Sequence, residues 1–189
     1  MTSTDRPYFD ELYATASDPW NFATSWYERR KYALTVATLP RIRYRNAFEP
    51  GCSIGILSEL LAPRCDRLLA TDINSIALEQ ASERLKNCAG VEVEFRAIPE
   101  SWPSEQFDLV VLSELAYYFD EAALDIIVAD VVQSTLPESH LIGVHWRGKT
   151  NYPLTGDQAH DQIGECKKLR QLVHHLEEKF VLDLWERVD

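Results

Sequence analysis

From Ala47 onward, short apolar runs alternate with stretches in which apolar residues recur at helical spacing. This alternation is typical of successive strand-helix-strand units around a parallel sheet. It predicts strands at residues 47–49, 67–72, 91–98, 107–112, 140–146 and 180–187. It predicts helices at residues 54–61, 75–86, 120–132 and 155–178, the last two opening at Asp120 and at a Thr155-x-x-Gln158 capping box. The expected fold class is α/β, with a doubly wound, mostly parallel, Rossmann-like sheet.

The chain ends after the sixth predicted strand, one short of a full seven-stranded sheet of this type. The missing last strand would leave a sheet edge exposed. Such an edge could be covered by the leader segment 1–45 or paired with a second copy in a homodimer. We expect one domain over residues 1–189, with residues 1–45 as a helical leader or lid and a helix at 26–38.

Composition narrows the class of protein. The 189 residues are 46% hydrophobic and carry a net charge of −11, so a globular protein is expected and nucleic acid is a poor partner. The four cysteines form no C-x-x-C pair, which argues against a zinc cluster, and no metal site is predicted. The sequence has neither a signal peptide nor a membrane span, so we expect a cytoplasmic protein that does not insert into membranes.

The strongest chemical signal lies just after the first two strands. Glu49-Pro50-Gly51-Cys52-Ser53-Ile54-Gly55 follows the first, and Asp72 ends the second. Two glycines let a backbone turn tightly beside a ligand, and an ionised carboxylate can accept both hydroxyl hydrogen bonds of a ribose. Either feature alone is explained by a turn or a strand end, whereas together and in this order they favour a nucleoside cofactor.

Two cofactors compete for this geometry. The NAD fingerprint G-x-G-x-x-G, counted from Gly51, needs glycine at positions 53 and 56, where the chain has Ser53 and Ile56. A pyrophosphate also disfavours a neighbouring carboxylate, whereas S-adenosylmethionine (SAM) carries an ammonium and a sulfonium that suit Glu49. We therefore expect SAM.

At this point the sequence resembles the class I SAM-dependent methyltransferases, whose first motif is an acid followed by x-Gly-x-Gly-x-Gly. Ser53 replaces the middle glycine. More narrowly, residues 18 to 145 resemble the NodS N-methyltransferase family through these features: Asp18-Pro19-Trp20, Glu49-x-Gly51-Cys52-x-x-Gly55, Leu61-Ala62-Pro63-x-Cys65, Asp72, and Phe107-Asp108-Leu109-x-Val111-x-Ser113-Glu114 with Tyr117-Tyr118.

The resemblance implies a class I methyltransferase fold with SAM on the 49–55 loop and the ribose on Asp72. It implies the adenine near residues 97 and 98, and the methionyl part beside Ser113-Glu114. The cofactor-binding residues expected on this basis are Trp20, Glu49, Gly51, Cys52, Ser53, Gly55, Asp72, Ile73, Ala97, Ile98, Ser113 and Glu114. NodS enzymes methylate an amine of a chitin-type oligosaccharide. For this chain the resemblance leads us to expect an amine acceptor, but not specifically a sugar.

The acceptor residues are expected at the carboxyl ends of the fourth and fifth strands. Methyl transfer needs alignment, exclusion of water and a free lone pair on the amine. We expect Glu114, Tyr117 and His145 to be the catalytic residues, with His145 as the base or acceptor-orienting group; a packed, hydrogen-bonded histidine is the alternative. Trp20, Trp26 and Tyr27 could form a lid, with Arg29, Arg30 and Lys31 near the cofactor carboxylate, although packing is the alternative for the aromatic residues.

The sequence thus predicts a methyltransferase whose acceptor is a small molecule, and we expect this molecule to be an amine. An NAD(P)-dependent oxidoreductase and a non-catalytic SAM-binding domain remain the alternatives.

Overall fold

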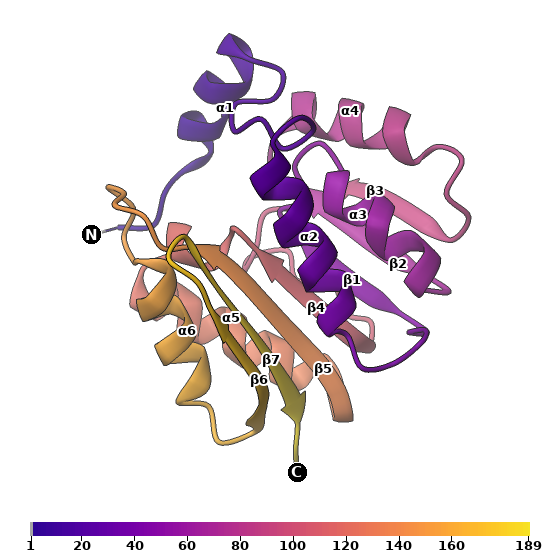
Figure 1. Ribbon diagram of the computed structural model, residues 1–189, viewed down its shortest axis with the longest axis vertical. Helices are drawn as coiled ribbons and strands as arrows, with labels where there is room; N and C mark the ends of the chain where they lie inside the picture. Colours follow the sequence, from indigo (N-terminus) through magenta and orange to yellow (C-terminus); the bar gives the residue numbers. More distant parts are fainter. Residues whose placement is uncertain (1) are drawn as a thin grey trace. The chain divides into compact units, whose positions relative to one another are not determined.

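The computed structural model describes residues 2–189, which divide into two compact units. The first unit holds residues 5–97, and the second holds residues 98–189 together with the short segment 2–4. Figure 1 shows the helices and strands of each unit. The single domain expected over 1–189 stays a prediction.

The first unit has a parallel three-stranded sheet in the order β3-β2-β1. Its strands are β1 (Ala47–Pro50), β2 (Leu68–Asp72) and β3 (Val91–Phe95); its helices are α1 (Arg6–Thr15), α2 (Trp26–Thr38), α3 (Ile56–Leu61), the 3-10 turn η1 (Ala62–Arg64) and α4 (Ser75–Leu85). Because the strands are parallel, the 51–55 loop and Asp72 leave the sheet at the same end.

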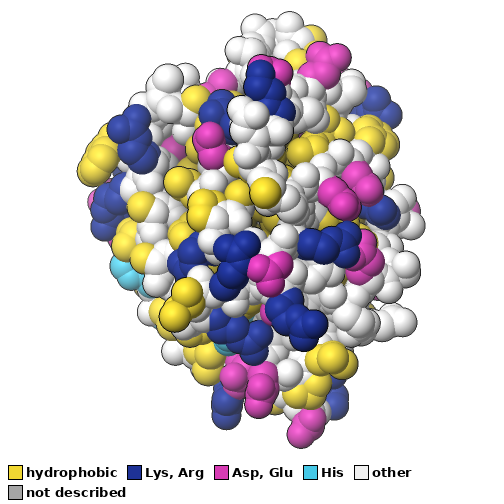
Figure 2. Space-filling view, turned by 90° about the vertical axis from the view of Figure 1, so that its right-hand side faces the viewer, with side chains coloured by type: hydrophobic (Ala, Val, Ile, Leu, Met, Phe, Trp, Pro, Cys, Tyr) yellow, Lys and Arg dark blue, Asp and Glu magenta, His cyan; other side chains and the backbone are white. Residues whose placement is uncertain are grey.

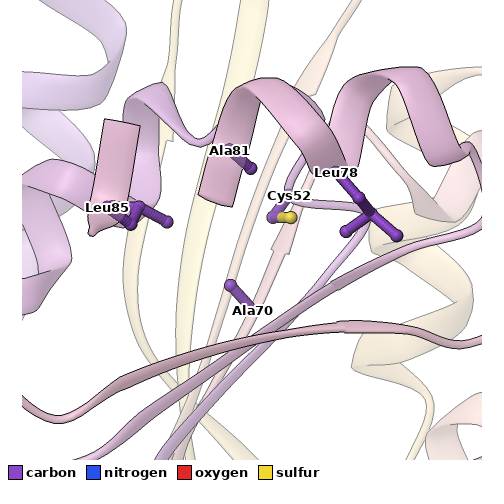
Figure 3. Close-up of a cluster of buried hydrophobic side chains, with 5 residues drawn as sticks. All are labelled: Cys52, Ala70, Leu78, Ala81 and Leu85. Carbon is purple, nitrogen blue, oxygen red and sulfur yellow. The ribbon is translucent and has the colours of Figure 1, made fainter. Parts of the chain in front are cut away.

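The core of this unit forms where α4 packs on β2. Asn74 caps α4 by accepting a 2.9 Å hydrogen bond from the main-chain N–H of Ala77. Leu78, Ala81 and Leu85, at helical spacing, then turn one apolar face toward the sheet. Figure 3 shows these side chains around Cys52 of the loop, with Ala70 of β2 below them. The loop is therefore fixed to the core as well as to the strands.

The second unit has a mixed sheet in the order β4-β5-β7-β6. β4 and β5 are parallel, and β7 pairs antiparallel with both β5 and β6. The elements are β4 (Phe107–Ser113), the 3-10 turn η2 (Ala116–Tyr118), α5 (Glu121–Gln133), β5 (Thr135–Trp146), α6 (Gly156–Gly164), β6 (Leu169–Leu176) and β7 (Phe180–Arg187). The predicted caps at Asp120 and Thr155 are both confirmed.

The helix predicted at 155–178 is wrong beyond Gly164. The prediction that the last strand is missing is wrong for the same reason. α6 ends at Gly164, and Leu169–Leu176 forms β6. The described residues therefore contain seven strands, and the sheet does not lack its last one. Among the described residues β6 has only one neighbouring strand, and most of its side chains are exposed, so its sequence carries no strong strand pattern. Its apolar residues happen to fit helical spacing as well.

Smaller differences concern element ends and the leader. β3 ends at Phe95 rather than at residue 98, β5 begins at Thr135 rather than at residue 140, and α1 was not predicted. The helix predicted at 26–38 is confirmed as α2. Within residues 2–189, no helix is both long enough and apolar enough to cross a membrane. Despite the net negative charge, the face drawn in Figure 2 carries Lys and Arg side chains beside Asp and Glu.

Candidate functional site

The loop after β1 has an unusual backbone. Gly51, Ser53 and Gly55 all have positive φ angles, of 73°, 52° and 78°. Glycine adopts this left-handed conformation freely, whereas a residue with a Cβ does so at a cost. This alternation explains why the related motif places glycine at all three positions. Ser53 departs from that pattern but gains a contact, because its hydroxyl hydrogen-bonds with the Tyr13 hydroxyl of α1.

Asp72 joins this loop to the end of β2. Its Oδ2 accepts a 2.8 Å hydrogen bond from the main-chain N–H of Ser53, and its Oδ1 accepts one of 2.9 Å from that of Asn74. Burial raises the pKa of Asp72, while the N–H groups of Asn74, Ser53 and Ile73 oppose the shift by stabilising the carboxylate. An ionised carboxylate has about four lone-pair sites, so acceptor capacity remains for a ligand. The loop and the acid predicted from the sequence are thus brought together.

Glu49 lies in β1, where its side chain is almost completely buried. Burial raises the pKa of Glu49 to about 7, and the charge of Asp72 adds to the shift, while the nearby Ser58 hydroxyl opposes it. Among the described residues, neither Glu49 Oε2 nor Ser58 Oγ has a hydrogen-bond partner of good geometry. Buried polar atoms are rarely left in this state, and a cationic ligand would compensate a carboxylate here.

Cys52 and Gly55 hold the loop against α4. The Cys52 side chain points into the apolar cluster shown in Figure 3, and burial together with Asp72 and Glu49 raises the pKa of its thiol. A Cβ on Gly55 would lie 3.2 Å from the Cα of Ala81. The side chain of Cys52 therefore serves packing, and its predicted part in cofactor binding would fall to its main chain.

The leader covers this loop from one side. Tyr13 of α1 is buried with Ile54 and Ala77, and Trp20 packs against the same cluster. Asp18 positions Trp20 by accepting 2.9 Å hydrogen bonds from the N–H groups of Phe22 and Ala23. Tyr13 is a site residue that sequence reasoning missed, because α1 has no motif.

The other leader residues predicted for the lid have different surroundings from Trp20. Trp26 is 71% exposed, and Tyr27 lies beside Lys31, with 5.0 Å between the Lys31 ammonium and the ring centroid. Lys31 is buried and forms a 2.7 Å ion pair with Glu28, while Arg29 and Arg30 are exposed. Of the three aromatic residues predicted for the lid, Trp20 is the one that packs against the cluster containing Ile54 of the loop, and the lid itself stays a prediction.

Ile73, Ala97 and Ile98 stay predictions as cofactor residues. Ile73 follows Asp72, and its main-chain N–H lies close enough to the carboxylate to lower the pKa of Asp72. Ala97 follows β3 at the end of the first unit, and Ile98 begins the main segment of the second.

In the second unit, Glu114 follows β4 directly after Ser113, as predicted. Its φ of 52° is left-handed, a strained conformation that proteins concentrate at functional sites. Glu114 Oε2 accepts a 2.9 Å hydrogen bond from the main-chain N–H of Trp146 and one from the hydroxyl of Tyr117. Glu114 and Tyr117, both expected to be catalytic, are therefore in direct contact.

Three tyrosines gather beside this pair. The Tyr117 ring lies 4.8 Å from that of Tyr118 and 5.1 Å from that of Tyr152, centroid to centroid. Burial and the neighbouring Glu114 raise the pKa of Tyr117, so its hydroxyl stays protonated and donates a hydrogen bond to the carboxylate. Tyr152 lies in a loop without a sequence signal, and the sequence did not predict its place here.

His145 is completely buried near the end of β5, where its ring contacts Tyr117 edge-on with 5.3 Å between centroids. Its Nε2 lies 2.9 Å from the main-chain nitrogen of Ala116, and its Nδ1 lies 2.8 Å from Nε2 of His160. Both ring nitrogens thus have partners within the protein. Within residues 2–189, no cluster of His, Cys, Asp and Glu is suited to hold a metal ion.

Comparisons with known proteins agree with this picture. The family model of Nodulation protein S (NodS) matches residues 10–149. Nodulation protein S of Rhizobium tropici is 30% identical over 129 residues, which are 67% of this chain and 54% of that protein. The protein of the same name from Bradyrhizobium diazoefficiens is 30% identical over 75% of this chain and 69% of its own length. The chain therefore spans only about half to two thirds of these relatives.

Solved structures show the same fold. A proposed methyltransferase from Pseudomonas syringae matches with a TM-score of 0.77 and 43% identity, over 86% of this chain and 100% of that one. The N-methyltransferase NodS from Bradyrhizobium japonicum WM9, in complex with S-adenosyl-l-homocysteine (SAH), matches with a TM-score of 0.86 and 22% identity, over 97% and 98% of the two chains. The expected class I methyltransferase fold is confirmed.

Proposed function

This chain belongs to the NodS family, and on that premise we propose that it is a SAM-dependent methyltransferase that acts on an amine of a small molecule. The single observation that carries the proposal is the glycine loop bonded to Asp72 beside the buried carboxylate of Glu49. The solved NodS N-methyltransferase bound to SAH supports the choice of cofactor and of an amine acceptor.

The residues of the first unit fit the cofactor. The free lone pairs of Asp72 would accept the ribose hydroxyls, and Glu49 would supply negative charge toward a cationic ligand. Bound SAM would supply an electrophilic methyl group on its sulfonium. The left-handed positions 51, 53 and 55 do not follow the spacing of an NAD fingerprint, and a buried carboxylate disfavours a pyrophosphate.

The residues of the second unit support an amine acceptor. An amine must be neutral to attack the methyl carbon, and the product ammonium then loses a proton. The Glu114 carboxylate is held in place by Tyr117 and Trp146, so it could orient the amine or take that proton. The tyrosines around it would supply an apolar wall that excludes water.

Methyl transfer can be tested with tritiated SAM and two matched acceptors. We would use a chitooligosaccharide with one free amine and the same oligosaccharide fully N-acetylated. Transfer to the first but not the second would establish an amine acceptor of this class. SAH binding without transfer to these or to a panel of small amines would instead support the non-catalytic alternative. No binding of SAM or SAH would refute the proposal.

A further inference from the structure

A chain of four side chains, the first exposed and the other three buried, runs through the second unit to η2. It begins at His174 on β6, passes through Asp183 on β7 and His160 on α6, and reaches His145 on β5. The successive contacts are His174 Nδ1 to Asp183 Oδ1 at 2.6 Å, Asp183 Oδ2 to His160 Nδ1 at 2.7 Å, His160 Nε2 to His145 Nδ1 at 2.8 Å, and His145 Nε2 to the Ala116 nitrogen at 2.9 Å. We refer to it as the His145 chain.

The contact with Ala116 determines which atom donates and which accepts in each hydrogen bond of the His145 chain. A main-chain N–H can only donate, so His145 Nε2 must be the acceptor and carries no proton. His145 therefore has its proton on Nδ1, and this N–H donates a hydrogen bond to Nε2 of His160. His160 in turn has its proton on Nδ1, and this N–H donates a hydrogen bond to Asp183. Both buried rings are thus neutral and of the same tautomer.

This arrangement leaves His145 without a nitrogen that could take a proton from an amine. The lone pair of Nε2 accepts the N–H of Ala116, Nδ1 bears a proton, and the ring is completely buried. A general base must reach the group that it deprotonates. The His145 chain also ends at a main-chain amide, which is too weak an acid to pass its proton on during a reaction, so the chain cannot deliver a proton to a substrate.

We propose that His145 is a positioning residue that holds η2, and with it Tyr117 and Glu114, in the arrangement used for methyl transfer. This inference rests on the proposed function. Ala116 is the first residue of η2, and the ring of its neighbour Tyr117 packs on that of His145. Trp146, which follows His145, bonds directly to Glu114. The end of β5 therefore fixes Glu114 in two ways, through Trp146 and through η2.

Two glycines leave room for the His145 chain. A Cβ on Gly143 of β5 would lie 3.3 Å from Cε1 of His160, and one on Gly156 of α6 would lie 3.1 Å from Cβ of His145 and 2.4 Å from the carbonyl oxygen of Trp146. Close approach of α6 to β5 depends on both positions. The contact between the two histidines is therefore built into the backbone.

Two substitutions separate the positioning role from that of a base. His145→Gln places an amide oxygen near the position of Nε2, where it can still accept the Ala116 N–H. His145→Asn places its amide near Nδ1, where it can donate to His160 but cannot reach Ala116. We expect about fivefold or less loss of kcat in H145Q and at least about thirtyfold in H145N, measured with the free-amine oligosaccharide. Equal, large losses in both variants would show a base instead, because neither amide takes a proton.

Hydrogen exchange gives a readout that needs no acceptor. The amide of Ala116 should exchange at a similar rate in the wild type and H145Q, and at least about tenfold faster in H145N. His175→Gln is the matched control, because His175 on β6 bonds to Glu177 and lies outside the His145 chain. Equal exchange in H145Q and H145N would overturn the proposal.

A measurement on the wild-type protein tests the positioning role even if both variants unfold. Nitrogen-15 NMR of the histidine rings should show His145 and His160 neutral, with the proton on Nδ1. A proton on Nε2 of His145 would overturn the inference. Titration of the same samples with SAH tests the proposed function separately, because a failure to bind SAH leaves the ring tautomers as they are.

Discussion

The main-chain N–H of Ser53 donates a 2.8 Å hydrogen bond to the carboxylate of Asp72, although the two residues are 19 positions apart in the sequence. This bond joins the left-handed turn after β1 to the acid that ends β2. The loop is therefore held in place before any ligand binds, and less conformational entropy is lost on binding.

Replacing Asp72 by asparagine should weaken SAH binding about thirty- to a hundredfold. The amide loses the negative charge and offers only one oxygen, which cannot serve Ser53, Asn74 and the ribose together. Isothermal titration of the folded variant measures the effect. The control is Asp161→Asn on the exposed face of α6, which should bind SAH like the wild type. Unchanged affinity in D72N would refute the ribose assignment.

The stability of the protein should depend on the protonation of Glu49. Its pKa is about 7 in the folded state against 4.5 for the unfolded chain. Its contribution is therefore fully present below pH 4.5 and is lost as the pH rises through about 7. The free energy of unfolding of the wild type should fall by about 3 kcal/mol relative to Glu49→Gln over this range. Denaturant unfolding at several pH values tests this, and parallel curves would contradict it.

Cofactor binding should release protons from Glu49. A ligand that carries an ammonium favours the ionised carboxylate and lowers its pKa, so binding near pH 6.5 expels a fraction of a proton. Calorimetry in buffers of different ionisation enthalpy counts these protons. Methylthioadenosine, which has the nucleoside but no ammonium, should release fewer than SAH. Equal release by both ligands, or undiminished release in Glu49→Gln, would show that another group titrates.

At position 53, glycine should be more stable than alanine. Both substitutions remove the hydroxyl that contacts Tyr13, but only alanine keeps a Cβ at a φ of 52°. The difference in unfolding free energy should be about 1 kcal/mol in favour of S53G. Urea unfolding of the two variants measures it directly. An S53A protein as stable as S53G would mean that this backbone position is not strained.

Gly55→Ala should destabilise the protein by about 1 to 3 kcal/mol. The new Cβ would meet the main chain of Ala81 at 3.2 Å in a left-handed conformation. Gly164→Ala provides the control, because a Cβ at Gly164 would meet nothing within 4 Å. Thermal unfolding should show a lower midpoint for G55A alone. Equal midpoints for the two variants would argue against the close packing of the loop on α4.

Most of the fold could be predicted from the sequence because buried strands and amphipathic helices leave periodic patterns. The predicted strand ending at Asp72 and the helix beginning at Ser75 both form, the helix ending one residue earlier than predicted. β6 could not be predicted, because an edge strand has few buried side chains and its apolar residues also fit a helix. That single error produced the prediction of a missing strand.

The candidate site divides in the same way. The 49–55 loop and Asp72 could be predicted because a backbone that needs left-handed residues shows it as glycine spacing. The His145 chain could not, because His160 and Asp183 come from separate elements whose packing decides the contact. Because residues 169–176 were predicted to be helical, the contact of His174 with Asp183 could not be predicted either.

Calorimetric titration of the purified chain with SAH and with NADH tests the central claim most directly. The account predicts a dissociation constant for SAH in the micromolar range and no detectable heat with NADH. Absence of SAH binding by a folded sample would contradict it, and binding of NADH instead would restore the oxidoreductase alternative.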